Sequence, residues 1–220
     1  MKQNIEEIRQ KIIAHLKWDN RIDASMIKVD IVGNAVVLSG YVKSTAEKKA
    51  AEYDVRAIPG VIKIENKIEI RLEELERHSD DQIAWNVKSM LTLNAEIDEN
   101  RIDVSVNKGT VILKGSVDLY WKKIRTEELV STVPGVISVI NTLTVVHTPI
   151  PFDQSIAQDI MNALERIGTI DLEAIIVEVE GGRVVLRGKV PDWHSYSSAH
   201  NIVKYTRGVT DLTNNLIISE

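Results

Sequence analysis

The side chains best suited to recognition chemistry are aromatic and basic residues in the middle third of the chain. They form the run YWKKIR at residues 120–125, and a further tryptophan, Trp85, lies upstream. Amphipathic aromatic rings beside Lys and Arg suit the surface of an anionic lipid bilayer. The sequence therefore predicts a candidate lipid or partner surface whose members are Trp85, Trp121, Lys122, Lys123 and Arg125.

The same residues have a plainer interpretation. A neighbouring part of the chain could cover Trp85 and Trp121, with the cations simply solvated. On a helical wheel Trp85 lies opposite Ile83, Val87 and Leu91, which predicts that it is exposed. Each cation near an anionic leaflet contributes about 1 kcal/mol. Three give about 3 kcal/mol, which is weaker than millimolar affinity, so binding needs aromatic insertion or several modules acting together.

Catalytic chemistry finds no support in the sequence. The chain has no cysteine, and it lacks the motifs of serine hydrolases, zinc proteases, P-loop enzymes and dinucleotide-binding folds. The histidines do not show the spacing of metal ligands: they are His15, His78, His147, His194 and His200. We therefore predict no catalytic, cofactor-binding or metal site, and a protein that is not an enzyme.

Charge and hydropathy exclude further classes. A net charge of −5 argues against general nucleic-acid binding, which requires a basic surface. The first 18 residues hold no apolar core of the kind found in signal peptides, and no apolar run is long enough to span a membrane. We expect a cytoplasmic protein without a transmembrane segment, or a periplasmic one if a leader has been removed.

One strand pattern occurs three times and organises the chain. The strand ends in Gly40, Gly115 and Gly188, which are separated by 75 and then 73 residues. An asparagine follows each copy at a similar distance, at Asn66, Asn141 and Asn214. A period above 70 residues is the size of a small domain rather than of a solenoid repeat. These glycines and asparagines are therefore interpreted as structural repeat positions.

Hydrophobic periodicity gives the elements of each copy. In the first, residues 4–17 and 44–58 show helical spacing, and residues 27–31, 35–42 and 62–70 alternate as strands do. Gly40 is expected to point toward the core and to let a helix approach the sheet closely. Asn66 falls on the apolar face of its strand, so its amide must find partners in nearby backbone.

The predicted fold class is α+β. It consists of three tandem αββαβ modules, each with a mixed three-stranded sheet and two helices packed on one face. The predicted boundaries are residues 1–73, 79–147 and 153–220, joined by a charged connector at 71–79 and a proline-containing linker at 147–151. The opposite sheet faces are partly apolar, at Val37, Ile112 and Val185, and would suit contacts between modules.

This combination of motifs resembles the BON domain. The first copy carries it best, and the second departs from it at residues 120–123, where the Ser-x-x-Glu-Lys helix start is lost. The matching residues are Leu38-Ser39-Gly40, Val42, Ser44, Glu47-Lys48, Ala51, Pro59-Gly60-Val61 and Asn66, then Gly115, Val117, Pro134-Gly135-Val136 and Asn141, then Gly188, Val190, Gly208-Val209 and Asn214. The resemblance implies non-enzymatic binding or stress-protective roles, with phospholipid surfaces as ligands.

The leading hypothesis is a non-catalytic adaptor, related to stress, that associates with an anionic phospholipid surface or a protein partner. The alternative is a structural scaffold that binds its own copies through apolar sheet faces. The stress role comes from the family resemblance alone.

Overall fold

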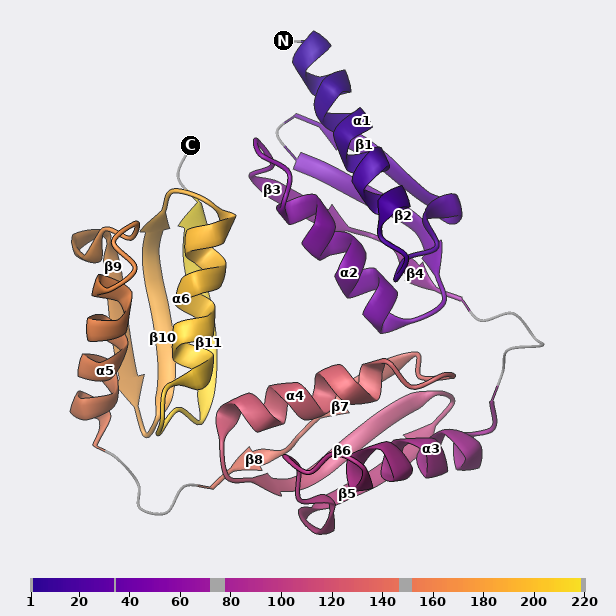
Figure 1. Cartoon of the computed structure of the whole chain (residues 1–220), viewed down its shortest axis with the longest axis vertical. Helices are drawn as coiled ribbons and strands as arrows, with labels where there is room; N and C mark the ends of the chain where they lie inside the picture. Colours follow the sequence, from indigo (N-terminus) through magenta and orange to yellow (C-terminus); the bar gives the residue numbers. More distant parts are fainter. Residues whose placement is uncertain (1, 34, 72–77, 147–151, 219–220) are drawn as a thin grey trace. The chain divides into compact units, whose positions relative to one another are not determined.

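The computed structural model describes residues 2–33, 35–71, 78–146 and 152–218 (Figure 1). It contains three modules with the same order of elements: module 1 (residues 2–71), module 2 (78–146) and module 3 (152–218). The connector at 72–77 and the linker at 147–151, including His147, lie outside the described residues. Across the described residues, none of the helices combines the length and apolar character needed to cross a bilayer.

Module 1 begins with a helix and continues with a hairpin. Its elements are α1 (Lys2–Trp18), a short 3-10 helix (Ala24–Met26), β1 (Ile27–Val32), β2 (Ala35–Val42), α2 (Thr45–Arg56), β3 (Lys63–Asn66) and β4 (Glu69–Ile70). Strand β1 pairs antiparallel with β2, and both β3 and β4 pair parallel with it. The last two are therefore one interrupted third strand. Helix α1 starts two residues before the predicted position.

Modules 2 and 3 repeat this arrangement. Module 2 contains α3 (Asp80–Thr92), a 3-10 helix (Glu99–Arg101), β5 (Ile102–Asn107), β6 (Thr110–Val117), α4 (Tyr120–Ser131), β7 (Ser138–Asn141) and β8 (Thr144–Val145). Module 3 contains α5 (Asp153–Glu165), a 3-10 helix (Leu172–Ala174), β9 (Ile175–Glu180), β10 (Arg183–Val190), α6 (Trp193–Tyr205) and β11 (Asp211–Ile218). In module 3, β9 is antiparallel and β11 parallel to β10. The predicted α+β class with mixed sheets is confirmed.

Alternation along the central strand places two helices on one face of the sheet. In module 1, Val36 and Leu38 point into the core that Ile12 of α1 and Val55 of α2 also enter. Because residues two apart on a strand share a face, both helices cover the same side, as Figure 1 shows. Ser44 begins α2 by accepting a hydrogen bond from the backbone N–H of Glu47 at 3.1 Å.

The repeated glycines have a more specific cause than the one expected. Gly40 has a φ of +103°, and a Cβ there would lie 2.0 Å from the carbonyl oxygen of Met26. The same holds for Gly115 against Arg101 and for Gly188 against Ala174, at 2.0 and 1.9 Å. The backbone that approaches is the last residue of the 3-10 helix before each hairpin, rather than one of the two long helices packed on the sheet. The left-handed φ favours glycine independently.

The repeated asparagines bind backbone, as the sequence predicts. Asn66 donates to the carbonyl of Lys48 at 3.1 Å and accepts from the N–H of Ile68 at 3.2 Å. These bonds join the interruption of the third strand to helix α2. In module 3, Asn214 keeps the accepted bond, from Leu216 at 3.2 Å, but its buried Nδ2 has no hydrogen-bond partner.

Candidate aromatic-basic surface of module 2

Helix α4, which carries most of the predicted surface, starts against the usual electrostatic rules. The first helical turn carries no acidic residue, while Lys122 and Lys123 lie near its positive end. Cations at a helix N-terminus are unfavourable by some tenths of a kcal/mol each, up to about 1 kcal/mol. The sequence therefore places these lysines here at a cost to the helix.

The other two modules cap the corresponding helix with a side chain. Ser44 caps α2, and Asp192 caps α6 by accepting a hydrogen bond from the N–H of Ser195 at 2.7 Å. The equivalent residue of module 2 is Leu119, whose side chain has no such oxygen. Loss of a capping side chain costs about 1 kcal/mol. The start of α4 thus departs from its two counterparts in capping as well as in charge.

Trp121 and Lys122 are in contact. The Lys122 Nζ lies 5.8 Å from the centre of the Trp121 ring, within the range of a cation–π interaction. The same ammonium group forms an ion pair of 3.0 Å with Asp118, and the Lys122 side chain is only 21% exposed. Burial would raise the pKa of Asp118, but the hydrogen bond from Lys122, a backbone hydrogen bond and the charges of Lys122 and Arg101 together lower that pKa. Lys122 is therefore held in place and partly neutralised.

Hydrogen bonds fix the backbone of this first turn. The carbonyl of Lys122 accepts from the buried hydroxyl of Thr126 at 2.8 Å. The carbonyl of Lys123 accepts from the side-chain amide of Asn141 at 2.9 Å. The repeat asparagine of module 2 thus ties the strand interruption to the helix turn that presents the lysines.

Trp85 lies on α3 and is 65% exposed, whereas Ile83, Val87 and Leu91 on the same helix are buried. The helical-wheel prediction of an exposed Trp85 is confirmed. Arg125 is also exposed, on the second turn of α4. The structure brings Trp121 and Lys122 into contact. That Trp85, Lys123 and Arg125 belong to the same binding surface stays a prediction.

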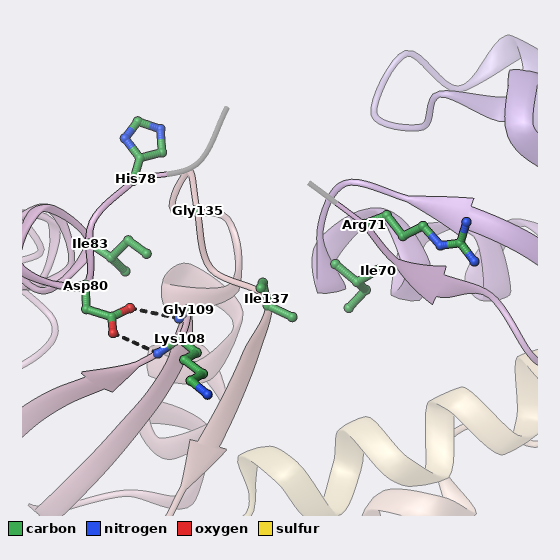
Figure 2. A pocket seen from close by; sticks show the side chains of 9 residues that line it. All are labelled: Ile70, Arg71, His78, Asp80, Ile83, Lys108, Gly109, Gly135 and Ile137. Atoms are coloured by element: carbon green, nitrogen blue, oxygen red, sulfur yellow. Dashed lines mark hydrogen bonds between the residues drawn. The ribbon is translucent and has the colours of Figure 1, made fainter. Parts of the chain in front are cut away.

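Asp80 joins the start of α3 to the turn between β5 and β6. Its carboxylate accepts hydrogen bonds from the backbone N–H groups of Lys108 and Gly109, at 2.8 and 2.9 Å, in the β5–β6 turn (Figure 2). Asp153 does the same in module 3, with Gly181 and Gly182 at 2.8 and 2.9 Å. Sequence reasoning missed this pair. The signal was an aspartate at the same place in two copies, where module 1 has Ile5.

Sequence reasoning also missed two aromatic–cation pairs outside module 2. The Arg71 guanidinium lies 5.1 Å from the ring centre of Tyr41, and the Lys204 Nζ lies 5.5 Å from that of Tyr205. Lys204 and Tyr205 are adjacent in the sequence, which was a usable signal. Tyr41 and Arg71 are brought together only because β4 pairs with β2. Each module therefore presents a cation over an aromatic ring.

The described ranges contain no group of three or more His, Asp or Glu side chains placed to hold a metal ion. The start of α4 combines an aromatic ring, cations and one carboxylate that partly neutralises them.

Comparison with known proteins finds similar sequences and similar structures. Osmotically-inducible protein Y of Escherichia coli (strain K12) is 27% identical over 140 residues, which are 62% of this chain and 70% of that protein. Two structures of CdsD, a structural protein of the type III secretion system of Chlamydia trachomatis, align with 13% identity and TM-scores of 0.27. One alignment covers 96% of both chains, and the other covers 97% of this chain and 94% of that one.

The family model of the BON domain matches at residues 4–71, 79–147 and 152–220. These three matches take in nearly the whole chain and coincide with the three repeated modules, whose predicted ends remain a prediction. Repeated motifs, repeated fold and family matches agree, and the chain belongs to the BON-domain family.

Proposed function

We propose that this protein is a non-catalytic, stress-related binding protein that associates with anionic phospholipid surfaces, with α4 of module 2 as a docking element. The stress role rests on the name of its relative, osmotically-inducible protein Y. The observation that carries the lipid role is the start of α4, where the Lys122 ammonium lies 5.8 Å from the centre of the Trp121 ring, Leu119 stands in place of the usual cap, and two lysines lie in the first turns. Residues that oppose local stability are expected at functional positions.

The energetics limit what α4 does alone. Lys122, Lys123 and Arg125 together supply about 3 kcal/mol near an anionic leaflet. Asp118, paired with Lys122 at 3.0 Å, reduces this further. Insertion of an aromatic ring at the interface is therefore part of the proposal, with the half-buried Trp121 and the exposed Trp85 as the rings.

The other modules supply additional weak contacts. The pairs Tyr41–Arg71 and Tyr205–Lys204 repeat the chemistry of Trp121–Lys122, and Tyr205 is 63% exposed. Modules tethered in one chain bind a common surface with an effective concentration set by their linkers. Weak contacts in several modules would then give measurable association with a bilayer.

Co-sedimentation with liposomes tests this function. The full chain is mixed with vesicles of neutral phosphatidylcholine, or with vesicles containing phosphatidylglycerol, at low and physiological salt. We expect binding to the anionic vesicles and loss of part of it at the higher salt, because exposed charges are screened. Equal binding to both vesicle types, or no binding to either, would contradict the proposal.

The alternative function is self-association through the outer sheet faces. The side chains on the outer face of the module 3 sheet give it less support. Ile176 and Ile217 are exposed there, at 55% and 63%. On the same face Arg187 forms an ion pair of 3.3 Å with Glu178, so charged groups interrupt the apolar surface. Light scattering on the full chain separates the two ideas, since the scaffold requires a mass above 24.7 kDa without lipid.

A further inference from the structure

Module 1 buries a carboxyl group at a position where the other modules have half-buried apolar side chains. The Asp54 side chain, on α2, is 6% exposed, and its Oδ2 is buried without a hydrogen-bond partner. The corresponding residues of the second helix are Leu129 in module 2 and Ile202 in module 3. The fold therefore accepts an apolar side chain at this position, and the aspartate is a departure specific to module 1.

A second carboxyl group and one guanidinium lie against Asp54. Asp19, which follows α1, is 7% exposed, and its carboxylate accepts hydrogen bonds from the backbone N–H and the Nε of Arg21, both at 2.9 Å. The Arg21 Nη2 lies 2.5 Å from the Asp19 Oδ2 but 3.8 Å from the Asp54 Oδ1. Arg21 is therefore committed to Asp19, and its distance to Asp54 exceeds that of a hydrogen bond.

Other titratable groups act on this cluster from both helices. His15 of α1 is near enough to Asp54 to influence it, and Tyr53 of α2 influences Arg21. Burial raises the pKa of Asp54, the charge of Asp19 raises it further, and His15 and Arg21 oppose these effects. Hydrogen bonds from Arg21 lower the pKa of Asp19 to about 2. Of the two carboxyl groups, Asp19 is therefore the one that stays ionised, and Asp54 is the one that binds a proton more readily.

We propose that Asp54 is a proton-binding site that couples the packing of α1 against α2 to pH. With a proton, Asp54 donates a hydrogen bond toward Asp19, and the cluster of Asp19, Arg21 and Asp54 is neutral. Without it, Asp54 is a second buried carboxylate near Asp19, while Arg21 is already bound to Asp19 and its side chain is 67% exposed. Relief requires water or movement of the segment around Asp19, because an unpaired buried charge is expensive.

The direction of the pH effect follows from linkage. A group whose folded pKa is raised gives stability that is fully present below its unfolded pKa and is lost as pH rises through the folded pKa. Asp54 therefore makes module 1 more stable in mild acid than at higher pH. The exposed Trp18, which stacks on His15 with 5.7 Å between ring centres, lies at the end of α1 next to this cluster.

Carbon-13 NMR of the aspartate carboxyl groups in the full chain tests the proton directly. Asp54 is assigned as the resonance that disappears in Asp54→Asn. We expect it to titrate above the ordinary value of an aspartate, with Asp19 titrating below it. An Asp54 resonance that titrates at or below the ordinary value overturns the proposal.

Hydrogen–deuterium exchange tests the coupling. Protection factors of α1 and α2 amides in the wild type should fall as pH rises through the Asp54 titration. They should lose this added slope in Asp54→Asn, whose amide also donates to Asp19, and in Asp54→Leu, which copies module 2. Asp30→Asn, an exposed aspartate of module 1, should keep the wild-type slope. If both Asp54 variants keep the wild-type slope, Asp54 is a static buried group and the proposal is wrong.

Discussion

The side-chain amide of Asn141 donates a hydrogen bond of 2.9 Å to the carbonyl of Lys123, and its oxygen accepts one of 3.2 Å from the N–H of Leu143. The first bond reaches helix α4, and the second bridges the interruption between β7 and β8. One residue thus joins the parallel strand to the helix turn that presents the lysines. Asn66 makes the same two kinds of hydrogen bond in module 1, so the arrangement is a feature of the repeated module.

Replacing Asn141 with alanine should destabilise module 2 by about 1–3 kcal/mol, because two backbone groups lose their partner. Asn214→Ala should cost module 3 less, since the Nδ2 of Asn214 has no hydrogen-bond partner in the folded protein. Hydrogen–deuterium exchange of the full chain, followed in peptides from module 2 and module 3, measures the loss of stability in each variant. Equal costs at the two positions would contradict this account of the amide.

Gly188→Ala should be among the most damaging single substitutions in module 3. The added Cβ would lie 1.9 Å from the carbonyl oxygen of Ala174, at a φ of +124°. We expect a loss of about 3 kcal/mol or more from strain and displaced backbone. Gly181→Ala is the control, because its φ of +57° is also left-handed but its Cβ would meet nothing within 4 Å.

Urea denaturation of both variants, followed through module 3, should rank them clearly. Gly181→Ala should cost about 1 kcal/mol, the strain of the left-handed backbone alone. If the two alanines were equally tolerated, the close approach of backbone at Gly188 would not be the reason for the repeated glycine.

Asp80→Ala should loosen the start of α3 by about 1–3 kcal/mol, because the N–H groups of Lys108 and Gly109 lose a charged acceptor. Asp81→Ala removes a charge from the same helical turn and should cost only about 0.3–1 kcal/mol. Exchange of the Gly109 amide is the measurement. Similar exchange in both variants would mean that helix electrostatics, rather than the two hydrogen bonds, accounts for Asp80.

The ion pair of Asp19 and Arg21 should stabilise module 1 at neutral pH and not in strong acid. Because the folded pKa of Asp19 is lowered to about 2, its contribution is present above the unfolded value and lost as pH falls through the folded one. Asp19→Asn should therefore cost about 1–2 kcal/mol at pH ~6, allowing for the exposure of Arg21, and less near pH ~2. A cost that does not shrink in acid would contradict this assignment.

Much of the fold could be predicted from the sequence because the sequence repeats. Three copies of one strand pattern gave the modules, and alternation along residues such as Val36 and Leu38 gave the buried sheet face. The importance of Gly40 was predicted correctly, but the segment that approaches it was not. A pattern of apolar residues reports which side is buried, whereas the approach of the Met26 carbonyl depends on how the hairpin is entered.

The candidate functional residues were harder to predict from the sequence than the fold. An exposed Trp85 follows from helical spacing alone. The pair Tyr41–Arg71 requires knowledge of strand pairing, and the cluster around Asp54 requires knowledge of how α1 and α2 pack. Comparison of the copies with one another would have marked Asp54, because Leu129 and Ile202 stand in its place.

Binding of α4 variants to anionic vesicles tests the central claim most directly. The variant Trp121→Ala/Lys122→Glu/Lys123→Glu is compared with wild type and with Lys88→Glu/Lys114→Glu, which makes the same change of charge elsewhere in module 2. A third variant, Trp121→Ala alone, separates the contribution of the ring from that of the charges. We predict that the α4 variant loses most of the bound fraction, while Lys88→Glu/Lys114→Glu keeps most of it. Equal loss in those two variants, or wild-type binding by the α4 variant, would contradict a docking role for α4.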